Sequence, residues 1–395
     1  MCSAAKPFDP GHPGQESELM VAIDATPCLA SSTGVGEYVR NLVDAIAAVR
    51  HGFPRLWAAS IRKGAAGALR TRFPGLPVRV THLPMKLLGP LTDRISWPGL
   101  ETLLGNADVF HAGPLLVPAS RTTAIVSTVY DLTPLRFPDF HLPGNRFTAR
   151  QLSRRLERAE LVIVPSASTA RDLRHFEIVR EQKVRMIPLA ASRFFSPGDT
   201  EDLAAISGLG LEKAYILNAG ALEPRKNLPR LFEAFKLLKD RHRIPHKLVV
   251  AGPRGWKDRE IFESVQRLRL AESVILAGYV SRETLRLLYS RAALFVYPSL
   301  YEGFGLPPLE AMACGCPVAV SNVSSLPEVV GEAGVYFDPM EVEDIARAIM
   351  RILDSSALRA ELVESGMIRS GQFSWAKVAD STRAVYREAQ QLRRG

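Results

Sequence analysis

Short apolar runs recur along the whole chain and alternate with stretches of helical periodicity. The runs at 214–218 and 293–297 are apolar at nearly every position, without the alternation of a strand that has one face in solvent. Such continuous runs are typical of parallel strands covered on both faces. The predicted strands are 20–24, 55–60, 78–83, 108–111, 123–129, 161–164, 184–187, 214–218, 247–251, 274–276, 293–297 and 317–320.

Between these runs, apolar side chains recur three or four residues apart, as they do on the buried face of a helix. In segment 37–49 these positions include Tyr38, Leu42 and Ile46. The other predicted helices are 146–159, 168–176, 228–239, 258–270, 282–290, 341–353, 357–366 and 375–393. Strands that alternate with helices predict an α/β fold built from doubly wound parallel sheets.

The alternation of strands and helices occurs twice, and 395 residues are enough for two domains with full cores. The stretch 188–208 mixes Pro, Gly, Ser and acidic residues without periodicity, so we interpret it as a hinge. We therefore expect one doubly wound domain at 20–200, a second at 201–374, and a final helix at 375–395. Residues 1–19 are polar and contain Pro and Gly, which predicts a disordered lead-in.

The composition is that of a globular enzyme, with 47% hydrophobic and 23% charged residues. No apolar run reaches the roughly 18 residues that a membrane-spanning helix requires. The four cysteines, Cys2, Cys28, Cys314 and Cys316, do not form a disulfide framework, and no other ligands accompany the last two at metal-binding spacing. We therefore expect buried thiols, no metal site and a cytoplasmic location.

The net charge of +9 is uneven, with most of the cationic excess in the first half of the chain. Such a surface favours phosphorylated acceptors or an anionic membrane, so peripheral association with the inner face of the cell membrane is expected. The sequence contains neither a recognised nucleic-acid module nor a stripe of basic and aromatic residues. We therefore do not expect a nucleic-acid partner.

One stretch, 297–320, combines a strand, a Gly-rich turn, a short helix and a second strand. Glu302 lies on the turn and Glu310 lies about two helical turns further on. Free backbone N–H groups at such a helix start can bind anions and sugar hydroxyls, so the two glutamates could hold parts of one elongated ligand. On spacing alone, a plain tight turn with two solvated glutamates is equally acceptable.

A second group of charged residues, Arg225 and Lys226, follows the predicted strand 214–218 and precedes a helix. Ligands of open α/β sheets bind beyond the carboxyl ends of the strands, where two cations could balance a diphosphate. The alternative is a solvated basic pair at a helix start, which the positive end of the helix disfavours. A third loop, which contains Gly34 and Gly36, lies between a strand and a helix and could approach a phosphate or simply form a turn.

The stretch 302–318 resembles the E-x7-E signature of the GT4 family of retaining nucleotide-sugar glycosyltransferases. The resemblance covers the C-terminal half nearly continuously and the N-terminal half more thinly. The further motifs that carry it are 220–227, 251–256, 278–280, 325–329 and 373–375. It implies the GT-B fold, in which two Rossmann-like domains face each other across a cleft and the last helix crosses back to the first domain.

The resemblance also implies roles for particular residues. Glu310 would accept hydrogen bonds from the nucleotide ribose, Glu302 would contact the transferred sugar, and Arg225 and Lys226 would stabilise the leaving diphosphate. The remaining residues expected to bind the donor are Gly34, Gly36, Val280, Gly303, Phe304, Gly305 and Leu306, the last three through backbone N–H groups. For Val280, a plain strand-to-helix turn is an equal alternative. Neither a metal nor a cofactor is implied, because the nucleotide sugar is itself the substrate.

The sequence departs from the family pattern at two positions. Close relatives often have His where this chain has Tyr130, which can donate a hydrogen bond but does not titrate near neutral pH. The neighbouring Asp131 could contact the sugar or acceptor, or be a turn residue. Many relatives also have Arg where this chain has Ala221, so more of the phosphate charge would fall to Arg225 and Lys226.

The predicted function is transfer of a hexose from a nucleotide diphosphate sugar to a hydroxyl of a glycan or lipid-linked acceptor. The similarity to bacterial mannosyltransferase-like members favours GDP-mannose as the donor. Two alternatives are a nucleotide-sugar epimerase or phosphorylase of the same architecture, and a catalytically silent subunit that only binds the donor. The second alternative is suggested only by Tyr130.

Overall fold

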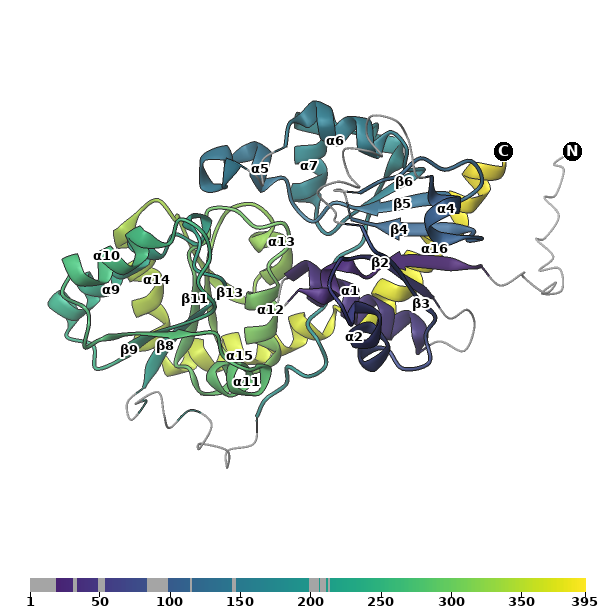
Figure 1. Cartoon of the computed structure of the whole chain (residues 1–395). Coiled ribbons are helices and arrows are strands. Elements are labelled where there is room, and N and C mark those ends of the chain that lie inside the picture. Colours follow the sequence, from purple (N-terminus) through teal and green to yellow (C-terminus); the bar gives the residue numbers. More distant parts are fainter. Residues whose placement is uncertain are drawn as a thin grey trace, which may run out of the picture.

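A computed structural model of the chain describes residues 19–30, 34–48, 54–83, 99–113, 116–143, 147–198, 206, 211 and 214–395. In this structure two parallel α/β units lie next to each other (Figure 1). Nearly all of the predicted lead-in at 1–19, and part of the predicted hinge at 188–208, fall outside the described residues.

The first unit is built on a seven-stranded parallel sheet with the strand order β3-β2-β1-β4-β5-β6-β7. The order reverses between β1 and β4, which places a topological switch point at the centre of the sheet. Ligands of open α/β sheets bind at such points. The strands are β1 (Val21–Asp24), β2 (Arg55–Ala59), β3 (Val78–Thr81), β4 (Val109–Ala112), β5 (Ala124–Thr128), β6 (Leu161–Val164) and β7 (Val184–Met186).

The second unit contains a six-stranded parallel sheet with the order β10-β9-β8-β11-β12-β13. Its switch point lies between β8 and β11, whose residues Leu217 and Phe295 pair in register. The strands are β8 (Tyr215–Ala219), β9 (Lys247–Ala251), β10 (Val274–Gly278), β11 (Leu294–Tyr297), β12 (Val318–Ser321) and β13 (Gly334–Phe337).

Helices cover both sheets, as the continuous apolar strands require. The described α-helices are α1 (Gly34–Ala47), α2 (Ala65–Arg72), α4 (Leu100–Leu104), α5 (Thr133–Arg136), α6 (Ala149–Leu156), α7 (Ala167–His175), α9 (Leu228–His242), α10 (Arg259–Arg267), α11 (Arg282–Arg291), α12 (Leu306–Ala313), α13 (Leu326–Val330), α14 (Val342–Asp354), α15 (Ser356–Gly371) and α16 (Trp375–Arg394). Short 3-10 turns are η1 (Thr26–Leu29), η2 (Pro138–Phe140), η4 (Glu181–Lys183) and η5 (Pro224–Lys226).

The predicted α/β fold class is confirmed, and each predicted strand is a strand in the structure. The pattern missed β13 (Gly334–Phe337), whose first residue is a glycine, a residue type depleted in strands. It also missed α2, α4, α5 and α13, which are four to eight residues long and span one or two turns. So short a segment shows little periodicity.

The last helix, α16, leaves the second unit and packs against α1 and β5 of the first (Figure 1). Ser374 caps its N-terminus by accepting a hydrogen bond from the Lys377 backbone N–H at 3.3 Å. Arg185, on β7, forms an ion pair with Glu388 of the helix. The two units are therefore connected by packing of the chain end as well as by the segment that follows β7.

A buried hydrogen-bond network fixes α16 on the first sheet. The hydroxyl of Tyr386 lies 2.6 Å from His111 Nδ1, and the Thr128 hydroxyl lies 2.7 Å from His111 Nε2. Burial lowers the pKa of His111 to about 3, so the imidazole is neutral and exchanges hydrogen bonds with two hydroxyl groups. His111 thus holds the crossing helix on the first sheet.

Tyr386→Phe tests this network. The variant keeps the ring, which is 1% exposed, but leaves His111 Nδ1 without a partner. We expect the free energy of unfolding to fall by about 1–2 kcal/mol. The measurement is urea unfolding followed by circular dichroism. Tyr279→Phe, at a position 62% exposed, is the control and should change stability by less than about 0.5 kcal/mol. Equal effects of the two substitutions would contradict the assignment.

Candidate functional site

The cations and one of the glutamates singled out in the sequence meet at the switch point of the second sheet. Lys226 Nζ lies 2.6 Å from Glu302 Oε1, and Arg225 Nη1 lies 2.7 Å from Glu302 Oε2. The cations follow β8 and the glutamate follows β11, 76 residues later. Because β8 and β11 are neighbouring parallel strands, their carboxyl ends deliver these side chains to the same edge.

Two further side chains complete this charge cluster, and the sequence alone did not single them out. Glu223 Oε1 lies 2.7 Å from Arg225 Nη2, and the Glu223 residue is only 3% exposed. Lys226 Nζ donates to the Tyr297 hydroxyl at 2.5 Å. Glu223 lies two residues before Arg225 in the same motif, and this closeness in sequence was the one signal that could have pointed to it.

The cluster has little exposure to solvent, and the charges of its members shift one another's pKa values. Burial alone would raise the pKa of Glu302, but Arg225 and Lys226 outweigh it and lower that pKa to about 2. Burial lowers the pKa of Lys226, and Arg225 lowers it further. Two cations and two carboxylates therefore balance, and both cations are fully paired in this structure. A bound anion would have to share them with Glu302.

The Gly-rich turn after Glu302 is pressed against the first unit. A Cβ on Gly303 would lie 2.0 Å from the backbone oxygen of Tyr130, so a side chain would push the two units apart. The Ser166 hydroxyl donates to the Gly303 carbonyl at 2.7 Å. Gly305 has φ +121°, a conformation that L side chains rarely adopt. The turn is thus held at the cleft between the units by contacts that only glycine permits.

The helix that follows the turn, α12, begins at Leu306, the last of the three positions at which backbone N–H groups were expected to bind the ligand. Pro307 and Pro308 occupy its first turn, where their missing N–H groups leave no hydrogen bond unmade. Cys314 and Cys316 behind it are buried free thiols, as predicted. Among the described residues, no three His, Cys, Asp or Glu side chains gather closely enough to hold a metal ion.

Glu310 lies apart from the charge cluster, at a second polar group. The Tyr289 hydroxyl approaches Glu310 Oε2 at 3.5 Å. Burial, and then the nearby charge of Glu37, raise the pKa of Glu310 to about 8, against an opposing effect of Arg282. The two predicted glutamates thus differ in protonation at neutral pH, because only Glu302 has cations in contact with it.

An ion pair that the sequence did not predict joins the two units beside Glu310. Glu37, in the first turn of α1, lies 3.1 Å from Arg282 at the start of α11. The predicted residue Gly36 is buried next to Glu37, whereas Gly34 is exposed, and a Cβ added to it would meet nothing within 4 Å. Both glycines, predicted to lie in a loop, belong to the first turn of α1, so it is the start of this helix that reaches the Glu310 side of the cleft.

Val280 follows β10 and is partly buried against the core, near the start of α11. It lies two residues before Arg282, which links the end of β10 to the same side of the cleft as Glu310. The structure therefore brings Val280 and Glu310 to one side and the cations and Glu302 to the other. The turn 303–305 connects the two sides.

The first unit contributes Tyr130 and Asp131 to the opposite wall of the cleft. The Tyr130 ring packs edge-on against Tyr38 at 5.1 Å, and burial raises its pKa well above the ordinary value. The Asp131 Cβ lies 2.9 Å from where a Cβ on Gly303 would be, so Asp131 lies against the turn next to Glu302. Asp131 Oδ1 also accepts the Thr133 backbone N–H at 3.0 Å, which makes Asp131 a turn residue as well.

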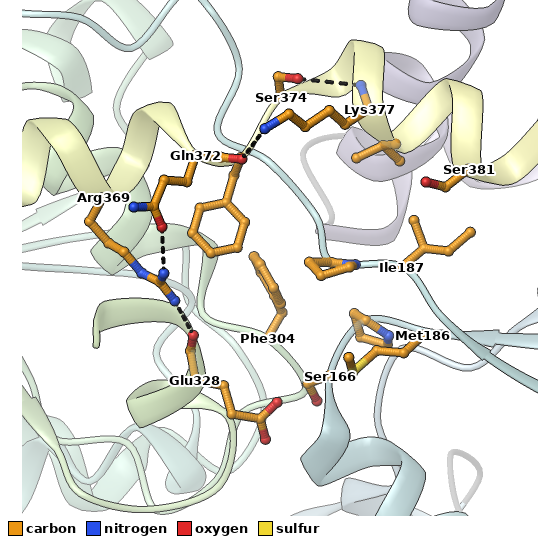
Figure 2. Close-up of a pocket in the computed structure, with 14 residues that line it drawn as sticks. Ser166, Met186, Ile187, Phe304, Glu328, Arg369, Gln372, Ser374, Lys377 and Ser381 are labelled. Carbon is orange, nitrogen blue, oxygen red and sulfur yellow. Dashed lines mark hydrogen bonds between the residues drawn. The ribbon is translucent and has the colours of Figure 1, made fainter. Parts of the chain in front are cut away.

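A cavity of about 380 Å³ lies beside the Gly-rich turn, and no residue of the charge cluster lines it. Figure 2 shows Phe304 pointing into it from the turn, towards residues that precede and begin α16. The Phe304 ring contacts Phe373 edge-on at 5.9 Å. Of the predicted site residues only Phe304 lines this cavity, through its side chain, whereas the sequence suggested a role for its backbone N–H.

Comparison with known proteins matches both halves of the chain to glycosyltransferase models. The model described as "Glycosyltransferase Family 4" matches residues 32–191. The model described as "Glycosyl transferases group 1" matches residues 199–368, which include Arg225, Lys226, Glu302 and Glu310. Among the described residues, no helix has the length and apolar character needed to cross a membrane.

The chain is similar to two bacterial mannosyltransferases. It is 35% identical to O-antigen chain mannosyltransferase B of Escherichia coli over 288 residues, which are 71% of this chain and 74% of that protein. It is 34% identical to the serotype-specific mannosyltransferase WbdA of Escherichia coli over 267 residues, which are 64% of this chain but only 32% of WbdA.

Solved structures share the fold at lower sequence identity. Sucrose-phosphate synthase of Thermosynechococcus elongatus superposes with a TM-score of 0.73 at 24% identity, covering 94% of this chain and 98% of that one. HepE of Anabaena, solved in complex with UDP and glucose, gives a TM-score of 0.72 at 17% identity and covers 94% and 100%. These matches confirm the predicted GT-B fold of two Rossmann-like units.

Glu310→Gln is expected to raise thermal stability at pH 8 and to leave it unchanged below pH 4.5. A carboxyl whose pKa rises from 4.5 to about 8 on folding stabilises the native state below pH 4.5, and this contribution is lost as the pH rises towards 8. The amide of the variant cannot ionise and so avoids the loss. Melting temperatures across this pH range test it, with Glu364→Gln at an exposed position as the control. A pH-independent difference would contradict the raised pKa.

Proposed function

The chain belongs to glycosyltransferase family 4, and we propose that it is a retaining hexosyltransferase that uses a nucleotide diphosphate sugar. The observation that carries the proposal is that Lys226 and Arg225 both form ion pairs with Glu302, with little exposure to solvent, at the edge of the second sheet. A diphosphate needs fixed cations, and a sugar needs a carboxylate that accepts its hydroxyl groups. Both are present within one cluster that faces the first unit.

In the proposed reaction the sugar passes from the diphosphate to the acceptor hydroxyl. The acceptor hydroxyl oxygen attacks the anomeric carbon, and the bond from that carbon to the β-phosphate oxygen breaks. The electron pair passes to the diphosphate, whose growing charge Lys226 and Arg225 stabilise, and the acceptor proton passes to a leaving phosphate oxygen. Attack on the face from which the phosphate departs retains the configuration. No carboxylate nucleophile is required, so Glu302 orients the sugar instead.

Donor binding on this proposal exchanges partners within the cluster. Phosphate oxygens replace Glu302 at Lys226 Nζ, and the released carboxylate of Glu302 accepts hydrogen bonds from the sugar. Glu223 stays on Arg225 and preserves the orientation of its guanidinium. The exchange keeps the buried charges paired at each stage, because an unpaired buried charge would cost several kcal/mol.

The nucleoside would lie on the other side of the turn, at Glu310 and Val280, with backbone N–H groups of 304–306 holding the sugar or phosphate. Gly36 would approach the donor from the first unit beside Glu37, which is paired with Arg282. The mannosyltransferases among the relatives support GDP-mannose as the donor. The acceptor would be a hydroxyl of a glycan or a lipid-linked glycan in polysaccharide synthesis.

The excess of cations supports peripheral association with an anionic membrane at its cytoplasmic face. Exposed arginines of the first unit, such as Arg150 and Arg154 on α6, contribute to this charge. Such an association would bring the enzyme to lipid-linked acceptors without a membrane-spanning segment. It is an electrostatic attraction and weakens as the salt concentration rises.

Thermal stabilisation by nucleotides tests the donor site. GDP-mannose at 100 times its dissociation constant is expected to stabilise the protein by about 2.7 kcal/mol relative to the free protein, and UDP- or dTDP-sugars at the same concentration by less. Lys226→Met removes the buried cation and should abolish this stabilisation. Arg259→Ala, at a solvent-exposed ion pair with Glu263, is the control and should bind like the wild type. Unchanged donor binding by the Lys226 variant would refute the assigned role.

The silent-subunit alternative depends on Tyr130, and the position of its ring argues against that alternative. The Tyr130 ring packs edge-on against Tyr38 at 5.1 Å and lines a small cavity of the first unit together with Asp24 and His111, so the ring lies among residues of the first unit. The Tyr130 contribution to the cleft is then its backbone oxygen at Gly303.

Tyr130→Phe should therefore keep kcat/KM for transfer within about threefold of the wild type, because the removed hydroxyl makes no contact with the donor. Transfer from GDP-[14C]mannose to a panel of mannose oligosaccharides measures it. A loss of more than tenfold would show that the hydroxyl contacts the sugar. A wild type that binds GDP-mannose without transfer would instead support the silent subunit, and donor turnover without an acceptor would support an epimerase.

A further inference from the structure

One segment of the first unit crosses the cleft and is fastened to the second unit. This strap, residues 131–141, contains α5 and η2 and extends from the end of β5 over the second unit (Figure 1). The indole Nε1 of Trp256 donates to the Phe140 carbonyl at 2.5 Å. Lys257 Nζ donates to the Asp139 carbonyl. Both bonds go to the backbone, so they hold the strap whatever side chains it presents.

The near end of the strap is held by a second set of contacts. The buried carboxylate of Asp172 accepts the Tyr301 hydroxyl at 2.5 Å and Arg136 Nη1 at 2.9 Å. Tyr301 immediately precedes Glu302, and its ring also lies 5.9 Å from that of Phe137. The strap is therefore connected directly to the residue next to the glutamate of the charge cluster.

The loop that holds the far end is packed onto the loop that carries the cations. A Cβ on Gly252 would lie 1.9 Å from the Gly220 carbonyl oxygen, and one on Gly255 would lie 2.5 Å from the Leu222 carbonyl oxygen. These contacts require glycine, and they account for the motif 251–256, which the donor site itself does not use. Trp256 is thus fixed in position relative to Arg225.

The surface so formed has the chemistry of a saccharide site. Phe137 and Phe140 stack at 5.2 Å with an interplanar angle of 9°, and Trp256 lies 5.6 Å from the His141 ring. Phe137, Phe140 and Trp256 each keep part of their surface exposed. The C–H face of a sugar ring is apolar and loses water on packing against aromatic rings, while its hydroxyls need acceptors such as Asp131.

We propose that the strap and Trp256 bind the acceptor glycan, with Asp131 next to the hydroxyl that is glycosylated. The inference rests on the proposed function, which places the transferred sugar at Glu302. A Cβ on Gly303, the residue after Glu302, would lie 2.9 Å from the Asp131 Cβ, so an acceptor held along the strap has its end at the transferred sugar. Because the strap belongs to one unit and Trp256 to the other, the acceptor site exists only when the cleft is closed.

The experiment separates acceptor binding from donor binding. Trp256→Ala removes one aromatic side chain of the proposed site together with the hydrogen bond to the Phe140 carbonyl. Phe137→Ala removes another aromatic side chain and keeps that hydrogen bond. Each variant is saturated with whichever of GDP, UDP or dTDP stabilises the wild type most. Binding is then measured on an array of mannose-, glucose-, galactose-, rhamnose- and N-acetylglucosamine-terminated oligosaccharides. Phe262→Leu, on α10 and packed against the core of the second unit, is the control.

We expect both variants to lose at least tenfold in affinity for the oligosaccharide that the wild type prefers, with nucleotide affinity within twofold. The control should match the wild type in both. Reduced nucleotide affinity of the variants would show that the rings contact the base and would overturn the inference. A wild type that binds nucleotide but no oligosaccharide, or variants with unchanged glycan affinity, would also overturn it. Failure of the wild type to bind any of the three nucleotides would instead contradict the proposed function.

Discussion

Lys226 is buried and Arg225 beside it is only partly exposed, so each needs a negative partner because an unpaired charge held out of water costs several kcal/mol. Glu302 and Glu223 supply those partners, one from the loop after β11 and one from the same loop as the cations. This requirement ties the Gly-rich turn to the end of β8. It also keeps Glu302 ionised, with a pKa of about 2, where a sugar hydroxyl can use it as an acceptor.

The cleft is closed around that cluster by contacts of three different kinds. Main-chain packing brings Gly303 onto Tyr130, an ion pair joins Glu37 to Arg282, and a hydrogen bond joins Trp256 to the strap. These contacts form only when the two units lie close to each other. Donor and acceptor on the proposed function would therefore meet in a space from which water is largely excluded, which suppresses hydrolysis of the donor.

The sequence was sufficient for the architecture because that information is local. Runs such as 293–297 must be covered on both faces, and their alternation with helices predicts parallel sheets with helices packed against them. The boundaries of α12 are local as well, because Pro307 and Pro308 suit its first turn and Gly315 follows its last residues. The missed segments β13 and α2 each contain a glycine, Gly334 and Gly67, whose low strand and helix propensities weaken the local signal.

For the site, the sequence determined which residues carry charge and where each loop leaves a strand. Only the tertiary structure decided which of them touch. Glu302 pairs with Lys226 across 76 residues because two parallel strands are neighbours, while Glu310, eight residues from Glu302, faces Glu37 from the other unit and holds its proton. Spacing along one chain cannot show this, because charge pairing depends on burial and on the distance between atoms of segments that are far apart in sequence.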